Sequence, residues 1–489
     1  MIELATKIHD RFTLEFKVGF NTEKADKQKK ASDFVMNTWI FVPNSLDINP
    51  TKYSKENFYR DLKSDQRIIT PNYTLHDLAN NDQLLPNQTL DNEFGDLSIA
   101  PDDTIDLVHA LKMYCAIAKS AFRDASKQAT ETDNAKQRIE NCELYLADAK
   151  QVLNRYRTLY KKLKNNGIKG KIVQDFAYAD EFLGNIMAVH TYRLRDKIHD
   201  SFPDDYSQLE SRFKDLLLGE RAYKSEQGYL NVNPDDPNGN EDFVFRTSLL
   251  KKFAESDLYL SSNKRKNTFL VEQILYSLAA GSAMLVATLS SFFFQQRYGN
   301  FTLPFLIALV VSYMFKDRLK EWLRLIFAKR LSGTVFDTRT DFRIKGRHVG
   351  WSKDSMDFID SDKMLPEVMR LRDRFPLFDE VSGCDEKVIL FRKKVRVWPS
   401  ELAKASPFPM SGINDILRYN ITELTRKMDN PSFSLSGSWE DEGYKPIEGR
   451  KIYRLTFVFQ CIYDGSTEYK RVTVKCDKNG LMAVRIGLD

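Results

Sequence analysis

The chain of 489 residues contains none of the short motifs that commonly identify an enzyme. It has no G-x-x-x-x-G-K-[ST] phosphate loop, no H-E-x-x-H metal pair, no G-x-S-x-G nucleophile turn and no G-x-G-x-x-G dinucleotide loop. Residues Gly167 to Lys171 come nearest to a phosphate loop, but the spacing is wrong and they follow a predicted helix rather than a strand. The sequence therefore predicts no catalytic residue, no cofactor and no metal ligand.

Cysteine is scarce as well, with five residues and no C-x-x-C pair. Cys461 and Cys476 lie in neighbouring predicted strands, but a turn at Asp464-Gly465 would place Cys461 opposite Glu468. Unpaired cysteines fit a reducing cytoplasm. The N-terminus lacks an apolar run of signal-peptide length, so we expect membrane insertion to depend on an internal segment.

The net charge is only +5, which is small enough to come from the basic flanks of one apolar segment. A nucleic-acid-binding protein would concentrate basic charge in one domain. The charge balance therefore argues against nucleic acid as a partner.

Two long uncharged runs lie between residues 268 and 331. They are Ile274–Phe294 and Tyr298–Phe315, and only three residues separate them. At about 1.5 Å per residue the helices would reach about 31 Å and about 27 Å, close to the ~30 Å hydrocarbon core of a bilayer. We therefore expect a two-span transmembrane helical hairpin over residues 268–331, with the lipid bilayer as a partner. The alternative is a buried helical hairpin inside a large soluble domain.

Basic residues cluster at the open ends of this hairpin. Those before it are Lys264, Arg265 and Lys266, and those after it are Lys316, Arg318, Lys320, Arg324, Lys329 and Arg330. The turn carries Arg297 alone. By the positive-inside bias, we expect both termini in the cytoplasm and the hairpin in the cell (inner) membrane. The apolar positions between Leu319 and Phe327 share one face, which indicates an amphipathic helix at the inner leaflet or an extension of the second span.

Small residues recur every four positions along the first run. The predicted membrane-packing residues are Ala279, Ala283, Ala287 and Ser291, with Ala308 and Ser312 in the second run. Small side chains at this spacing let two helices approach closely within lipid. We expect the hairpin to pack on itself, and contacts between protomers of a homo-oligomer are the alternative.

The whole chain is predicted to be an α+β membrane protein. We predict an N-terminal α+β segment over 1–100, a helical bundle with a coiled-coil hairpin over 101–227, a linker and juxtamembrane helix over 228–267, and a cytoplasmic α+β domain over 332–489. Residues Phe12–Phe20 alternate in polarity and Phe34–Val42 form an apolar run, so we predict an N-terminal β-hairpin. A helix with Ser54 as its N-cap follows, and then a loop to Pro101.

Four helices are predicted in the bundle segment. They begin near Leu107, Ile139, Lys171 and Asp204. The second keeps a spacing of three and four that is typical of a coiled coil, at Ile139, Cys142, Leu146, Ala149, Leu153, Tyr156, Tyr160 and Leu163. This seam is either the core of one chain or a contact between protomers.

The C-terminal domain combines strands with two helices. The predicted strands are Val335–Ile344, Met356–Ile359, Val388–Trp398 and a terminal antiparallel meander of Ser432–Trp439, Lys451–Tyr463, Thr467–Cys476 and Leu481–Ile486; the helices are Asp362–Arg374 and Ile413–Met428. Asp464-Gly465 and Asn479-Gly480 are strong hairpin turns.

Two groups of residues are candidates for chemistry. His-Asp pairs, which bind metal in some phosphohydrolases, occur at His9-Asp10, His76-Asp77 and His199-Asp200. His190 and His199 share a predicted helix but face opposite sides, so we interpret His190 as a core histidine. The basic run of Arg392, Lys393, Lys394 and Arg396, with Lys320 and Arg324, is the candidate contact for lipid headgroups or a small anionic ligand, and a solvated strand edge is the alternative.

Three functions fit these patterns. The first is a membrane-anchored scaffold or signal-sensing protein that binds a protein partner or a small ligand and couples that state to the hairpin. The second is an oligomeric effector that opens or disrupts the membrane. The third is a membrane-tethered, metal-dependent phosphohydrolase.

Overall fold

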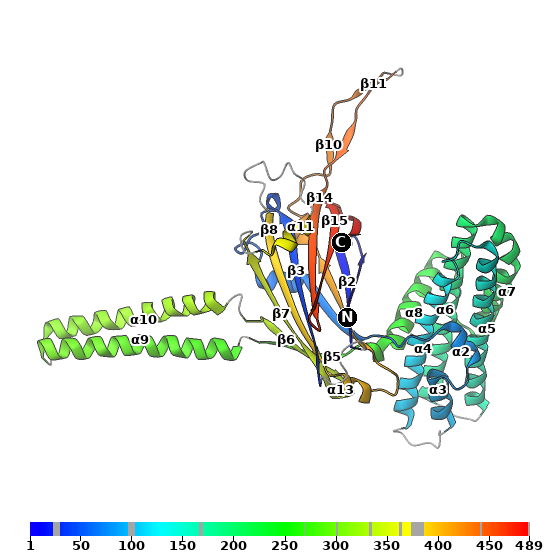
Figure 1. Cartoon of the computed structure of the whole chain (residues 1–489), viewed down its shortest axis with the longest axis horizontal. Helices are drawn as coiled ribbons and strands as arrows, with labels where there is room; N and C mark the ends of the chain where they lie inside the picture. The colour runs from blue at the N-terminus through cyan, green and yellow to red at the C-terminus, as the bar shows by residue number, and fades with distance from the viewer. Residues whose placement is uncertain are drawn as a thin grey trace. The chain divides into compact units, whose positions relative to one another are not determined.

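The chain has a mixed α+β fold with N-terminal strands, helices and a C-terminal antiparallel sheet (Figure 1). The computed structural model describes residues 1–22, 30–95, 103–165, 170–267, 269–299, 302–331, 335–360, 364–372, 386–440 and 443–487. Two compact units are present. The sheet unit comprises residues 1–66, 261–405 and 412–489, and the helical unit comprises residues 67–260 and 406–411.

Two β-sheets form the sheet unit. The larger has the order β16-β15-β14-β3-β8-β7-β6-β5, and all its neighbours are antiparallel. Its strands are β3 (Ser32–Pro43), β5 (Ser261–Lys266), β6 (Thr338–Ile344), β7 (Arg347–Ile359), β8 (Glu386–Val397), β14 (Tyr453–Tyr463), β15 (Ser466–Asp477) and β16 (Gly480–Gly487). The smaller sheet has the order β1 (Ile2–Ile8), β2 (Thr13–Asn21), β9 (Gly412–Asn420) and β4 (Leu62–Ile68). The Phe16 ring lies 5.1 Å from that of Phe457, so aromatic side chains join the two sheets.

Short elements complete this unit. They are η1 (Asn44–Leu46), α1 (Lys55–Asp61), α11 (Pro366–Leu371), α13 (Pro399–Lys404), α14 (Thr422–Thr425) and the ribbon strands β10 (Ser432–Ser434), β11 (Ser438–Glu440), β12 (Gly443–Lys445) and β13 (Glu448–Arg450). The predicted N-cap is confirmed, because the Ser54 side chain accepts a hydrogen bond from the backbone N–H of Asn57. The ends of the predicted helix Asp362–Arg374 lie outside the described residues.

The predicted N-terminal β-hairpin is wrong. β2 pairs with β1 and β9, whereas β3 pairs with β14 and β8 in the other sheet. The strand that pairs with β2 from the N-terminal side, β1, was not predicted. The predicted boundary between an N-terminal segment and a C-terminal domain also fails, because both contribute strands to the same two sheets. Pairing between distant segments leaves no local signal in either of them.

The predicted helix Ile413–Met428 is also wrong, since residues 412–420 form strand β9. Most of β9 is buried. A segment covered on all sides has no polar face, so its spacing of apolar residues cannot distinguish a helix from a strand. The terminal meander is confirmed, with Cys461 opposite Glu468 as expected. Asp464 (φ 45°) and Gly465 (φ 78°) form its first turn.

The helical unit contains α2 (Leu75–Asn80), α3 (Leu85–Gly95), α4 (Asp103–Gln128), α5 (Ala135–Asn165), α6 (Lys171–Ser201), α7 (Pro203–Gln227), α8 (Pro237–Glu255) and the short turn η2 (Ser256–Leu258). The four predicted long helices are confirmed as α4 to α7. The α5 seam, except the partly buried Ile139, lies in the core of this unit. Residues 228–267 were predicted to form a linker and a juxtamembrane helix. The helix in this segment is α8, which contacts α4 and α6 and therefore belongs to the helical unit.

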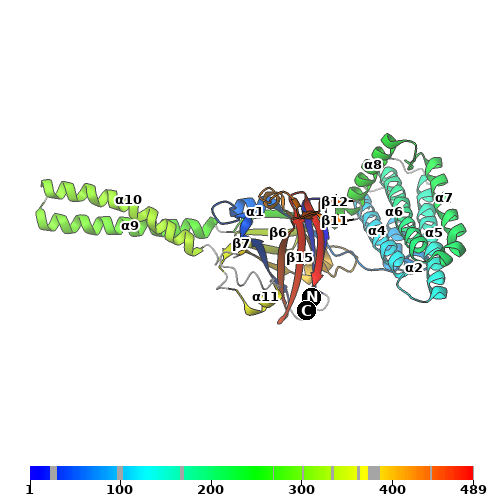
Figure 2. The same cartoon turned by 90° about the horizontal axis from the view of Figure 1, so that it is seen from above.

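Helices α9 (Phe269–Tyr298) and α10 (Leu303–Leu331) form the predicted hairpin and run side by side in both views (Figures 1 and 2). Among the described residues only α9 contains a segment long and apolar enough to cross a membrane, Glu272–Tyr298. Because α10 begins at Leu303 rather than Tyr298, its uncharged part ends at Phe315 after about 20 Å. The second predicted span is therefore shorter than the sequence indicated.

Candidate functional site

The root of the hairpin is held in the large sheet on both sides. β5 ends just before α9 and β6 begins just after α10, and the two strands pair with Lys264 opposite Thr340. Beyond β5, the backbone N–H of Asn267 donates to the carbonyl of Asp337 (3.0 Å), and its side-chain amide donates to the carbonyl of Phe336 (3.2 Å). The two chain ends that enter the hairpin are therefore joined to each other.

The carboxylate of Asp337 accepts three hydrogen bonds at this root. They are Lys55 Nζ at 2.9 Å, the Tyr59 hydroxyl at 3.0 Å and the backbone N–H of Met356 at 2.9 Å. Burial and then the Asp337 charge raise the pKa of Tyr59, so its hydroxyl remains a donor. Lys55 also pairs with Asp357 at 3.0 Å. We call Lys55, Tyr59, Asp337 and Asn267 the root cluster.

A buried ion network lies beside the root cluster. Lys393 on β8 is 1% exposed and pairs with Asp415 and, at 3.5 Å, with Asp354. The Ser64 hydroxyl donates to Asp415 at 2.7 Å. Burial lowers the pKa of Lys393, but the two carboxylates raise it further, so its net pKa is above the usual value. The carbonyl of Asp354 accepts the backbone N–H of Asp337 at 2.8 Å, so Asp354 connects this network to the root cluster.

The four basic residues predicted to form a contact surface on β8 do not share one face of the strand. Lys393 points into the core with Phe391 and Val395, so it is not a contact for lipid or for a free anion. On the other face of β8, Arg392 forms an ion pair with Asp357 and Arg396 forms an ion pair with Asp33. Lys394 is half-buried on that same face. The alternation along a strand separates residues that are adjacent in sequence.

The predicted membrane-packing residues line the contact between α9 and α10. Ala279 and Ala283 are fully buried, and Ala287 is 9% exposed. Ser291, Ala308 and Ser312 are half-buried, and the Ser291 hydroxyl donates to the carbonyl of Ala287. On α10, Lys320 is exposed, and the Arg324 guanidinium lies 4.3 Å from the Tyr276 ring.

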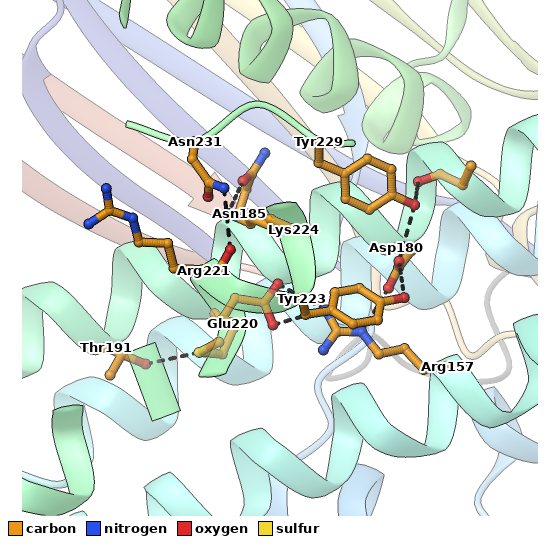
Figure 3. A network of polar contacts seen from close by, with 12 residues as sticks. Arg157, Asp180, Asn185, Thr191, Glu220, Arg221, Tyr223, Lys224, Tyr229 and Asn231 are labelled. Atoms are coloured by element: carbon orange, nitrogen blue, oxygen red, sulfur yellow. Dashed lines mark hydrogen bonds and ion pairs between the residues drawn. The ribbon is translucent and has the colours of Figure 1, made fainter. Parts of the chain in front are cut away.

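The helical unit encloses a second buried ion network (Figure 3). Arg157 on α5 donates to Asp180 (3.1 Å) and to Glu220 (2.8 Å), and Asp180 also accepts from the hydroxyls of Tyr223 and Tyr229. Asp180 and Glu220 are almost fully buried. A buried carboxylate is stable only with such partners, so the network ties α5, α6 and α7 to one another.

A cavity of about 350 Å³ also lies in the helical unit. Its lining includes Asn72, Tyr73, Thr74, Leu75, His76, Ala121, Asp124, Ala125, Gln128, Ala129, Asn141, Leu144, Tyr145 and Asp148, without a lysine or arginine. His76 contacts the nearly buried carboxylate of Asp148 at 3.1 Å rather than its sequence neighbour Asp77. The wall therefore carries acidic and amide groups, which favour a ligand rich in hydrogen-bond donors over an anion.

The two histidines of α6 have different surroundings. His190 is 8% exposed in the α6 core, and His199 contacts its neighbour Asp200 at 3.0 Å. Among the described residues, no three His, Cys, Asp or Glu side chains are grouped so as to hold a metal ion.

Sequence reasoning missed the root cluster and both ion networks. Lys55 is 282 residues from Asp337 in the chain, and the pairing of β6 with β7 brings Asp337 beside Asp354. The one available signal was Lys393, a charge within an alternating apolar face, which indicates a buried ion pair. No protein-family model, no curated protein and no solved structure matches this chain.

Proposed function

We propose that the protein is a membrane-attached scaffold or sensor in which α9 and α10 enter the bilayer and the sheet unit holds their root. The observation that carries this proposal is the exposed apolar surface of α9. Only 17% of its most apolar stretch is buried, and Leu285, Leu289 and Phe292 are each about 60% exposed. A core helix of a soluble protein would be mostly covered, so lipid is the natural environment of this surface.

Both open ends of the hairpin lie on one side of the membrane in this proposal. β5 and β6 are hydrogen-bonded neighbours, so the segments that enter and leave the hairpin stay together. The basic residues of β5 and of the second half of α10 favour the cytoplasmic face of the inner membrane.

A signal reaches the hairpin through its root in this proposal. Any change that shifts β7 or β8 acts on Asp354 and hence on Asp337, the residue that precedes β6. The cavity beside His76 is the proposed place for a small ligand that carries no net negative charge. The phosphohydrolase alternative gains no support from the described residues.

Membrane attachment is tested with two matched pairs of exposed leucines. In the first variant, Leu285 and Leu289 on α9 become lysine; in the second, Leu218 on α7 and Leu249 on α8 become lysine. All four side chains are exposed, so neither variant should unfold the protein. Each lysine in hydrocarbon costs about 2.5–3.5 kcal/mol. We expect the α9 variant alone to leave membranes in an alkaline carbonate wash.

Two results would reject the attachment. One is a full-length wild-type protein that washes off membranes with carbonate and stays monodisperse without detergent. The other is equal membrane retention of both leucine variants.

Coupling is tested separately with Asp337→Asn, which should accelerate hydrogen exchange in β5 and β6. The control is Asp65→Asn on β4, a half-exposed position, which should not.

A further inference from the structure

The two helices of the hairpin differ in charge at the same distance from the turn. Arg324 lies against Tyr276, which fixes the alignment of the antiparallel pair. Both residues are equally far from the turn, because the two helices rise equally per residue. By the same count, Lys316 lies at the level of Met284, the middle of the uncharged stretch of α9.

Charged residues of α10 therefore lie beside the most apolar part of α9. They are Lys316, Asp317, Arg318, Lys320, Glu321 and Arg324. At the same levels, α9 from Ile274 to Phe294 carries no charge. A lone hairpin that crossed the bilayer would place all these charges in hydrocarbon, where ionised side chains are strongly disfavoured.

Asp317, Lys320 and Glu321 face away from α9, whereas the long side chain of Arg324 reaches back to Tyr276 on α9. At 100° per residue, these three residues fall on one side of α10, and Ala308, Ser312 and Leu319 lie on the side that contacts α9. Asp317 and Glu321 are 68% and 57% exposed. The hairpin thus has an apolar outer surface on α9 and a mixed-charge outer surface on α10. We call the latter the charged face.

Shallow insertion does not resolve the mismatch. If the hairpin entered only as far as Phe315, the apolar residues Ile274 and Leu278 would remain in water, and both are more than half exposed. Anionic headgroups would satisfy Lys320 and Arg324 but would repel Asp317 and Glu321.

We propose that several copies of this chain associate in the membrane with α10 facing inward and α9 facing lipid, so that the charged faces line a polar interior. The occupant of the charged face is a second copy of the same face. It carries both signs of charge, so the basic residues of one copy can pair with the acidic residues of the next. This proposal rests on the membrane attachment proposed above, and it gives the hairpin the architecture of a polar passage.

The test compares two single cysteines that lie within one helical turn of the same level. Asp317→Cys lies on the charged face and Leu285→Cys on the apolar face, and both parent side chains are at least 60% exposed. The full-length protein is reconstituted in vesicles of phosphatidylcholine and phosphatidylglycerol. It is then treated with a charged maleimide that reaches both sides and, separately, with a short bifunctional thiol crosslinker. Both variants and the blank carry Cys384→Ser, because Cys384 lies outside the described residues; the other four native cysteines, Cys115, Cys142, Cys461 and Cys476, are buried.

We expect Asp317→Cys to be labelled about tenfold or more faster than Leu285→Cys, because lipid shields a thiol from a charged reagent. We also expect Asp317→Cys, but not Leu285→Cys, to crosslink between copies. Equal and fast labelling of both cysteines would mean that the hairpin is not in lipid, which overturns the membrane attachment as well. Protection of Leu285→Cys without labelling or crosslinking of Asp317→Cys would overturn the assembly alone.

Discussion

Replacement of Lys393 by methionine should destabilise the sheet unit strongly. The side chain is 1% exposed and lies between the carboxylates of Asp354 and Asp415. Methionine fills a similar volume but leaves two buried negative charges without a cation. Removal of one partner from a buried ion pair costs about 3–5 kcal/mol.

The expected change in melting temperature follows from the size of the unit. The unfolding entropy is about 2.1 cal/mol/K per residue, so a unit of roughly 290 residues melts about 1.6 °C lower for each kcal/mol lost. We expect Lys393→Met to lower the transition by about 5–8 °C. Tryptophan fluorescence is a selective probe, because all five tryptophans lie in the sheet unit, with Trp322 on its helix α10, and the helical unit has none.

Two controls make this test specific. Lys394→Met changes the adjacent, half-buried lysine on the other face of β8 and should cost less than about 0.5 kcal/mol. Combination of Lys393→Met with Asp354→Asn and Asp415→Asn should recover most of the loss, because neutral amides need no counter-ion. Equal melting temperatures for Lys393→Met and Lys394→Met would refute the reasoning.

The pH dependence gives an independent check. The folded-state pKa of Lys393 is raised, so the stability from its charge is complete below the unfolded-state pKa of about 10.4 and is lost as pH rises through the folded-state value. The difference between wild type and Lys393→Met should therefore persist at neutral pH and shrink in strong alkali.

Three further predictions concern single positions. Burial, followed by nearby cations, lowers the pKa of His190 to about 4, so the helical unit should lose about 3 kcal/mol as pH falls from about 6.5 to about 4, and acid titration followed by circular dichroism should show no such loss in His190→Gln. A Cβ at Gly184 would clash with the buried Glu220 carboxylate, so Gly184→Ala should cost roughly 1–3 kcal/mol in denaturant unfolding. In contrast, Gly219→Ala on the exposed side of α7 should gain about 0.5–1 kcal/mol. Ala283→Leu should disturb hairpin packing or assembly because Ala283 is fully buried, and unchanged particle size in detergent would contradict this.

Elements with one covered and one open face were predictable from local spacing. The long helices α4 to α7 each present an apolar stripe and a polar side, and the hairpin alanines recur at every fourth position. The turn at Asp464-Gly465 requires positive φ at both residues, which this pair tolerates. These features depend on a few consecutive residues, so they can be read without knowledge of the rest of the chain.

Elements covered on every side, and groups assembled from distant segments, were not predictable. The apolar spacing of β9 predicts a helix because the strand is buried within a sheet, and the adjacency of β2 and β3 in the chain predicts a hairpin although their partners lie elsewhere. The start of α10 at Leu303 shortened an apolar run that composition alone had extended to Tyr298. That change places the charges after Phe315 beside the apolar middle of α9.

Spacing in this chain thus encodes which surfaces avoid water, since burial of apolar side chains repeats with the period of each helix or strand. Spacing does not encode which surfaces pack against each other. Lys393 pairs with Asp354 and Asp415, and Asp337 accepts hydrogen bonds from Lys55 and Tyr59, only once distant strands have paired. A backbone hydrogen-bonding group accepts any partner of the right geometry, so the choice among partners is made by the fit of the whole fold.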